Sequence, residues 1–154
     1  MKRLLGLDYG ASRIGVALSD PGRAIASPHS AIHHSGWGPS ARAVKRLLLE
    51  TDSEYVVLGL PLDMSGTAGS QAQETLGFAR VLRGQGVRVA LQDERLTTFE
   101  AEEALKNAGK TREERRDLVD QVAAALILQA WLDAPGSEPE LEEQEPQGGE
   151  PPIK

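Results

Sequence analysis

The stretch from Leu4 to Asp20, LLGLDYGASRIGVALSD, decides the fold of this chain. Two apolar runs flank the short turn GASR, and this close spacing predicts an antiparallel hairpin over residues 3–9 and 14–19. Asp8 interrupts the first run just before the turn. Because a buried, unpaired carboxylate is costly, an acid in such a strand is usually paired, protonated or bound to a metal. The stretch therefore predicts a strand pair that carries a functional carboxylate.

The rest of the chain alternates between extended and helical patterns. Strands are expected at 23–33, 54–60 and 87–94, and helices at 39–50, 70–86, 97–107 and 111–133. Pro28 places the strand 23–33 at a sheet edge. Three helices begin with predicted capping boxes, at Ser70–Gln73, Thr97–Glu100 and Thr111–Glu114. A hairpin followed by this alternation predicts an α/β domain with a mixed five-stranded sheet, strand 3–9 at its centre and helices on both faces.

The net charge of −6 belongs to the C-terminal end of the chain. Residues 133–154 hold seven acidic residues, one lysine and five of the nine prolines, whereas residues 1–132 hold sixteen acidic and sixteen basic residues. Such an acidic, Pro-rich segment cannot bury enough apolar surface to order itself. We expect a single domain over 1–133 and a disordered tail over 134–154, mobile from residue 135 and dispensable for catalysis.

Composition excludes several classes of protein. The chain has no cysteine, so disulfide frameworks and thiolate metal sites are ruled out. The N-terminus lacks the apolar run of a signal peptide, and no apolar stretch approaches the roughly 18 residues that span a bilayer. We expect a cytoplasmic protein that does not contact membranes.

Two further acids interrupt apolar elements as Asp8 does. Glu94 ends a strand at its carboxyl end, where sites gather in α/β sheets, and Asp120 borders the apolar stripe of the last helix. Each acid alone could serve a cap, a turn or an ion pair, but three together indicate a site for one or two Mg²⁺ or Mn²⁺ ions, which prefer oxygen ligands. Asp93 and Glu94 point to opposite faces of the strand, so either one could face this site. Asp93 and Asp117 are accessory candidates.

Four motifs follow one another along the chain: LGLDYGASRIGVALSD, VVLGLPLDMSGTAGSQAQ, DERLTTFEAEEAL and DLVDQVAAALILQAWL. Over residues 2–133 they resemble the YqgF (RuvX) family of pre-16S rRNA nucleases, whose members have also been described as Holliday junction resolvases. The resemblance implies the RNase H-like fold of RuvC resolvases, a divalent metal, and maturation of the 5′ end of 16S rRNA. It also implies that Asp8, Glu94 and Asp120 are the catalytic and metal-binding acids. Asp117 stands where RuvC resolvases have a further acid.

Basic residues near these acids are candidate phosphate contacts. Five of them lie within residues 106–116, a run that on its own is typical of a solvated helix end. Arg112, Arg115 and Arg116 lie at the start of the helix that carries Asp120, where the macrodipole disfavours cations, and this position favours a bound anion. The predicted nucleic-acid contacts are Arg13, Arg95, Lys110, Arg112, Arg115 and Arg116. The loop 60–71 is either a phosphate cradle or a plain connection.

The main prediction is a metal-dependent nuclease acting on pre-16S rRNA, as a monomer or homodimer. A Holliday junction resolvase acting on branched DNA would use the same groups, in a symmetric dimer with two matched sites. An ATP-binding fragment of the sugar-kinase and actin type shares GLDYGASRIGVA, but that class closes two domains over its nucleotide and this length makes one. A non-catalytic nucleic-acid-binding module is disfavoured because all three acids are present.

Overall fold

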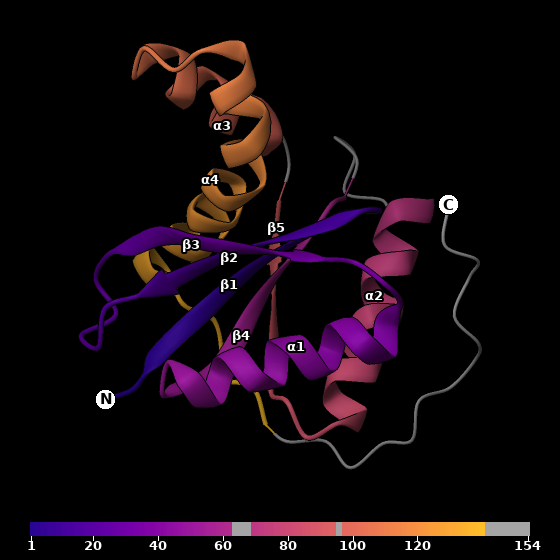
Figure 1. The fold of residues 1–154 in the computed structure, drawn as a ribbon. Helices are drawn as coiled ribbons and strands as arrows, with labels where there is room; N and C mark the ends of the chain where they lie inside the picture. Colours follow the sequence, from indigo (N-terminus) through magenta and orange to yellow (C-terminus); the bar gives the residue numbers. More distant parts are fainter. Residues whose placement is uncertain (63–68, 95–96, 141–154) are drawn as a thin grey trace.

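The computed structural model describes residues 1–62, 69–94 and 97–140, without the side chains of 97–99 and 116–117 (Figure 1). Its strands are β1 (Arg3–Tyr9), β2 (Arg13–Ser19), β3 (Ala26–His33), β4 (Ser53–Leu60) and β5 (Val89–Asp93). Its helices are α1 (Trp37–Glu50), α2 (Ser70–Gly84), α3 (Thr97–Asn107) and α4 (Arg112–Asp133). This order of elements confirms the predicted α/β class. Within the described residues, no helix is long and apolar enough to cross a membrane.

The strands form one mixed sheet in the order β3-β2-β1-β4-β5. β1 pairs antiparallel with β2 and parallel with β4, so the predicted central position of β1 is confirmed. β3 is an edge strand, and its register against β2 shifts between Val16 and Ala17, opposite Ser30 and Pro28. Proline has no N–H to donate to the ladder, which explains both the edge position and the irregularity.

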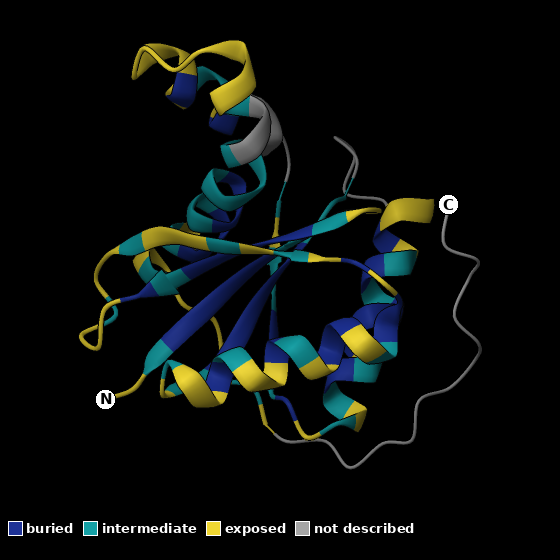
Figure 2. Ribbon diagram, viewed as in Figure 1, coloured by how far each residue is buried: buried dark blue, intermediate teal, exposed yellow. Residues whose placement is uncertain are grey.

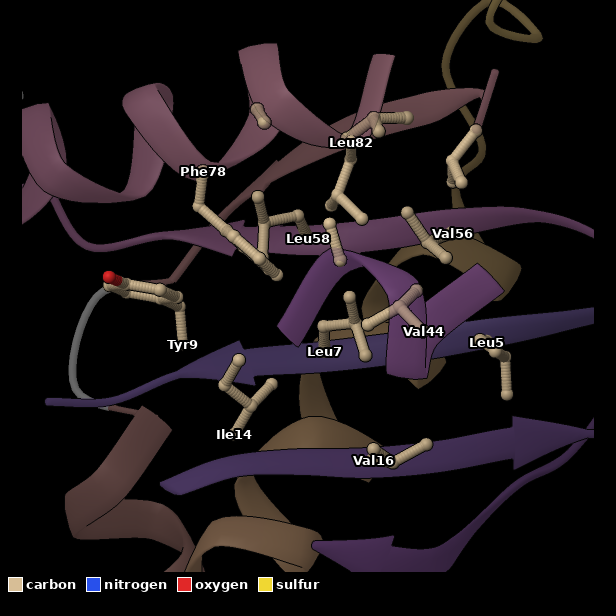
Figure 3. Close-up of a cluster of buried hydrophobic side chains, with 14 of the residues drawn as sticks. Leu5, Leu7, Tyr9, Ile14, Val16, Val44, Val56, Leu58, Phe78 and Leu82 are labelled. Carbon is tan, nitrogen blue, oxygen red and sulfur yellow. The ribbon is translucent and has the colours of Figure 1, made fainter. Parts of the chain in front are cut away.

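Helices cover both faces of the sheet, as Figure 1 shows, and each face has its own core. Because side chains alternate along a strand, Leu5 and Leu7 of β1 pack with α1 and α2, and Phe78 of α2 is fully buried in this cluster (Figure 3). Leu4 points the other way and packs with Leu128 of α4. Asp8 is an even-numbered residue of the same strand, so alternation places it on the face that α4 covers.

The helix starts test the predicted capping boxes. At α4 the prediction is confirmed, because Glu114 N donates to Thr111 Oγ1 at 3.2 Å and Thr111 N donates to Glu114 Oε1 at 3.1 Å. At α2 it is wrong: Gly69 is the N-cap, with no side-chain hydrogen bond, and Gln73 N donates to Gly69 O. Ser70 is thus already the first helical residue, where its hydroxyl cannot cap the N–H groups ahead of it. The box predicted at Thr97 involves a side chain outside the described residues.

The segment that follows α4 contacts Arg88, the residue before β5, as far as it is described. Arg88 Nε donates to Pro139 O at 2.8 Å, and Arg88 Nη2 lies 3.3 Å from Glu138 Oε1. Residues 141–154 lie outside the described residues. The domain boundary after Asp133, with its disordered tail, stays a prediction.

Candidate active site

Asp8 lies between two glycines in the central strands. In the sheet it pairs with Gly15 of β2. On the other side, Leu7 pairs with Leu58 of the parallel strand β4, so Asp8, the next residue of β1, lies beside Gly59. Neither glycine has a side chain, so groups from other elements occupy the space over Asp8 and its two strand neighbours.

One of these groups comes from α4. A Cβ atom on Gly15 would lie 2.0 Å from the main-chain oxygen of Asp120, so the absence of a side chain lets the helix rest directly on β2. The close approach brings Asp120 beside Asp8, although 112 positions separate them in the chain. The predicted meeting of the first strand and the last helix is therefore seen.

A second group comes from the end of β5. The main-chain N–H of Glu94 donates to Leu60 O at 3.1 Å, and a Cβ on Gly59 would lie 2.9 Å from Glu94 Oε2. The carboxylate of Glu94 thus lies over Gly59, on the face covered by α4. Ala90, two alternations earlier, packs in the α4 core, so Glu94 and not Asp93 is the acid that faces Asp8.

The electrostatics of Asp8 and Glu94 reflect their burial and the acids around them. Burial, and then the charge of Asp120, raise the pKa of Asp8 to about 7. Burial, followed by the charges of Asp8 and Asp93, raises the pKa of Glu94 to about 8. No residue in the described part of the chain forms an ion pair or a side-chain hydrogen bond with either carboxylate. Two partly buried acids without a cation form a donor set that suits a hard divalent ion.

Asp120 differs from these two acids because it has a cation partner. Arg13 Nε lies 3.2 Å from Asp120 Oδ2, and both side chains are partly exposed. The described residues contain no group of three side chains placed to hold a metal, and the convergence of all three acids within reach of one metal site stays a prediction. The Arg13 guanidinium offsets the charge of Asp120 beside Asp8.

His34 serves the core behind Asp8. Tyr9 points to the face of α1 and α2, where its hydroxyl is 2.9 Å from His34 Nε2 and accepts from Trp37 Nε1 at 2.8 Å. His34 Nδ1 is 2.7 Å from Ser40 Oγ. These buried groups satisfy one another and fix the strand end that carries Asp8, on the side away from the acids.

The predicted phosphate contacts are only partly brought together. Arg13, Arg112 and Arg115 line one cavity of about 340 Å³. Lys110 lies outside its lining, where it is 4.0 Å from Glu114. Arg95, the side chains of Arg116 and Asp117, and most of the loop 60–71 lie outside the described residues.

Sequence reasoning missed two kinds of residue that shape the candidate site. The glycines at 15 and 59 shape the acid site, but their partners come from α4 and β5, so nothing near them in the sequence identifies them. Lys106 also lines the cavity. Its position in the basic run was the available signal, yet only the packing of α3 on α4 shows that it faces Arg112 across a shared space.

The raised pKa values predict how the stability of the metal-free protein depends on pH. Unfolded, Asp8 and Glu94 lose their protons near their ordinary pKa values of 3.8 and 4.5, whereas the folded protein keeps them to about 7 and 8. Between these limits the folded state binds more protons, so the free energy of unfolding falls as pH rises. Each such carboxyl contributes up to about 1.4 kcal/mol per pH unit.

The measurement is urea denaturation in a chelator between pH 5 and 8, for wild type and Asp8→Asn. Groups distant from Asp8 contribute equally to both proteins and cancel in the comparison, whereas Glu94 loses the charge of Asp8 that raises its pKa, which also makes the decline shallower. We expect the decline in stability to be shallower in Asp8→Asn. Parallel curves would show that Asp8 is not held protonated in the folded state.

Comparison with known proteins places the chain in a family. Residues 2–134 match the family model described as "RuvX: Holliday junction resolvase". A relative from Syntrophomonas wolfei, named "Putative pre-16S rRNA nuclease", is 43% identical over 132 residues, which are 85% of this chain and 94% of the relative. A relative of the same name from Anaeromyxobacter sp. (strain Fw109-5) is 45% identical over 132 residues, 85% of this chain and 96% of the relative.

Solved structures support the fold. RuvC of T. thermophilus, in complex with a Holliday junction substrate, superposes with a TM-score of 0.54 at 17% identity, covering 91% of this chain and all of RuvC. A second Thermus thermophilus RuvC structure gives a TM-score of 0.51 at 18% identity, covering 90% of this chain and 99% of RuvC. The mixed sheet with helices on both faces is thus the RNase H-like fold. With its matched motifs, its relatives and this fold, the chain belongs to the RuvX (YqgF) family.

Proposed function

We propose that this protein is a divalent-metal-dependent nuclease that hydrolyses phosphodiester bonds during 5′-end maturation of pre-16S rRNA in the cytoplasm. One observation carries the proposal: Asp8 and Glu94 are partly buried without a described cation partner, and the charge of Asp120 acts on Asp8 while the charge of Asp8 acts on Glu94. The names of the curated relatives supply the substrate.

The three acids fit Mg²⁺ or Mn²⁺ by their chemistry. Asp8 and Glu94 offer carboxylate oxygens in a site of low dielectric, and Asp120 would join them by exchanging its contact with Arg13. A bound divalent ion supplies positive charge that activates water and stabilises charge on phosphate oxygens. The low dielectric strengthens each of these interactions.

The protein's own residues position the substrate. Gly15 and Gly59 let α4 and Glu94 approach the strand backbone closely, which gathers the acids around the space beside Asp8 where a phosphate would bind. Arg13 lies beside Asp120 and offers a guanidinium that can pair with a phosphate oxygen once it leaves the carboxylate. Asp93 points away from this space and is assigned no contact with the substrate.

A four-way DNA junction is the second candidate substrate, because the family description names Holliday junction resolvase. Such a reaction needs two sites at matched spacing, and hence a homodimer. The RNA reaction has no such requirement and proceeds in a monomer or a homodimer.

The test is to incubate the full-length protein and Mn²⁺ with a 5′-extended 16S precursor and, separately, with a four-way DNA junction. Asp8→Asn is the control for contaminating nuclease. We expect cleavage of the precursor RNA by wild type and not by the variant. Cleavage of the junction alone would replace RNA by DNA as the substrate, and cleavage of neither would overturn the assignment as a nuclease.

A further inference from the structure

A cavity of about 340 Å³ lies between α3 and α4, next to the acid site. Both helices extend beyond the sheet, and the turn between them is exposed (Figures 1 and 2). The cavity lining combines four cations, one acid and one apolar side chain: Arg13, Glu102, Lys106, Arg112, Arg115 and Val119. It gathers residues from three elements that are distant in the sequence.

The cations of the cavity exceed its anions. Glu102 is the one acid among the described lining residues, and its Oε2 lies 3.6 Å from Arg115 Nε. Lys106 lies 3.7 Å from Glu103, but both side chains are about half exposed, so this pair is weak. No described residue forms an ion pair with Arg112. The cavity therefore presents uncompensated positive charge to any ligand.

Part of the lining is already rigid. Arg115 Nη1 donates to Lys110 O at 2.9 Å, and its Nε faces Glu102, so the guanidinium is fixed from two sides. Arg112 begins α4, where the helix macrodipole adds to the positive potential. A fixed guanidinium beside a helix start loses little conformational entropy when an anion binds.

The composition of the lining selects the class of ligand. Stacking of nucleic-acid bases uses aromatic side chains, and none is found among the described lining residues. Arginine and lysine contacts to phosphate position a strand without reading its sequence. The volume exceeds that of a phosphate group alone, so the cavity has room for the adjoining sugar.

Arg13 connects this cavity to the acids. It lines the cavity and its Nε lies 3.2 Å from Asp120 Oδ2, so this side chain borders both the cavity and the acid site. A polynucleotide with one phosphate at the acids would place a neighbouring phosphate within reach of the cavity.

We propose that this cavity binds a backbone phosphate of the substrate strand, near the cleaved bond, through Arg112, Arg115 and Lys106, independently of base sequence. The proposal rests on the proposed function, since the substrate strand is the source of the phosphate. It adds a second subsite to the acid site and assigns Lys106 to substrate binding.

The test measures binding in EDTA, where no cleavage interferes, with a fluorescent single-stranded RNA and the full-length protein. Arg112→Gln is compared with Arg80→Gln, an exposed arginine of α2 on the opposite face of the sheet. The two variants have the same net charge. We expect Arg112→Gln to weaken binding by about fivefold or more and to lower the slope of log affinity against log salt by about 0.7, with no such change in Arg80→Gln.

A second measurement locates the phosphate. RNAs with one neutral methylphosphonate linkage, moved stepwise along the strand, are bound by wild type and by Arg112→Gln. We expect one linkage, other than the cleaved bond, at which the neutral methylphosphonate weakens RNA binding to wild type. At that linkage it should not weaken RNA binding to Arg112→Gln any further. Two results would overturn the subsite: equal effects of Arg112→Gln and Arg80→Gln, or no such coupled position.

The source of the phosphate is tested separately. If inorganic phosphate raises the melting temperature of wild type but not of Arg112→Gln, while RNA affinity is equal in both, the cavity is a free-anion site and the strand proposal is wrong. Failure of the proposed nuclease function would give a different result in these experiments. The protein would then bind RNA with the coupled position present and yet cleave no precursor with Mn²⁺.

Discussion

Asp8→Asn is expected to abolish cleavage while keeping or raising the stability of the metal-free protein. Asparagine preserves the shape of the side chain but removes a charged oxygen ligand. A divalent ion contributes several kcal/mol to the transition state, so the rate should fall at least about 100-fold. Without metal, the same change removes a charge that raises the pKa of Glu94, so the folded state loses a repulsion and no favourable contact.

The matching measurement is the melting temperature with and without Mn²⁺. An ion that binds the folded state alone stabilises it by mass action, so Mn²⁺ should raise the melting temperature of wild type. The rise should be much smaller in Asp8→Asn. Asp117→Asn, a neighbour of Asp120 in the sequence, serves as the control and should keep most of the activity and the full response to Mn²⁺.

Two results would contradict this assignment. The first is cleavage by Asp8→Asn at close to the wild-type rate. The second is loss of activity in Asp117→Asn with little loss in Asp8→Asn, which would move the site along α4. A variant that is inactive and also unfolded is identified by its melting curve, so lost activity and lost fold are separated.

The fold was predictable because its signals are local. The hairpin around Gly10, the edge strand with Pro28 and the capping box at Thr111 each depend on residues close together in the chain. The predicted capping box at Ser70 was wrong, because it rested on a local pattern that does not fix the first residue of the helix. A serine three residues before a glutamine fits the pattern, but a shift of one residue in the helix start makes the hydroxyl useless as a cap.

The site was predictable in its residue types more than in its arrangement. Alternation left Asp93 and Glu94 equivalent, and only the packing of Ala90 under α4 shows which of them faces Asp8. The Arg13–Asp120 ion pair joins β2 to α4 over more than one hundred residues, and no local pattern encodes it. Contacts of this kind follow from tertiary packing, in which the relevant partners are neighbours in space alone.

The approach of α4 to the sheet leads to the second large effect. Gly15→Ala should strongly destabilise the protein, because its Cβ would meet the main-chain oxygen of Asp120 at 2.0 Å. A flexible side chain could move aside, but here the backbone of α4 must shift. Overpacking in a core costs about 1–3 kcal/mol and occasionally more, and contact with a helix backbone places this case at or above the upper end. A loss of that size lowers the melting temperature on the order of 10 °C.

The control is Gly38→Ala in α1, which is the same chemical change in open surroundings. The nearest atom to a Cβ there is Arg42 Nη1 at 3.5 Å, the far end of a flexible side chain. Because Gly38 precedes Pro39, an alanine there gains little from its helix propensity, so Gly38→Ala should change stability by less than about 1 kcal/mol. Thermal and urea denaturation should give a large loss for Gly15→Ala and only a small change for Gly38→Ala if Gly15 sets the distance between α4 and the sheet. A Gly15→Ala protein as stable as wild type would show that α4 can retreat freely, in which case Asp120 is not held beside Asp8 by this contact.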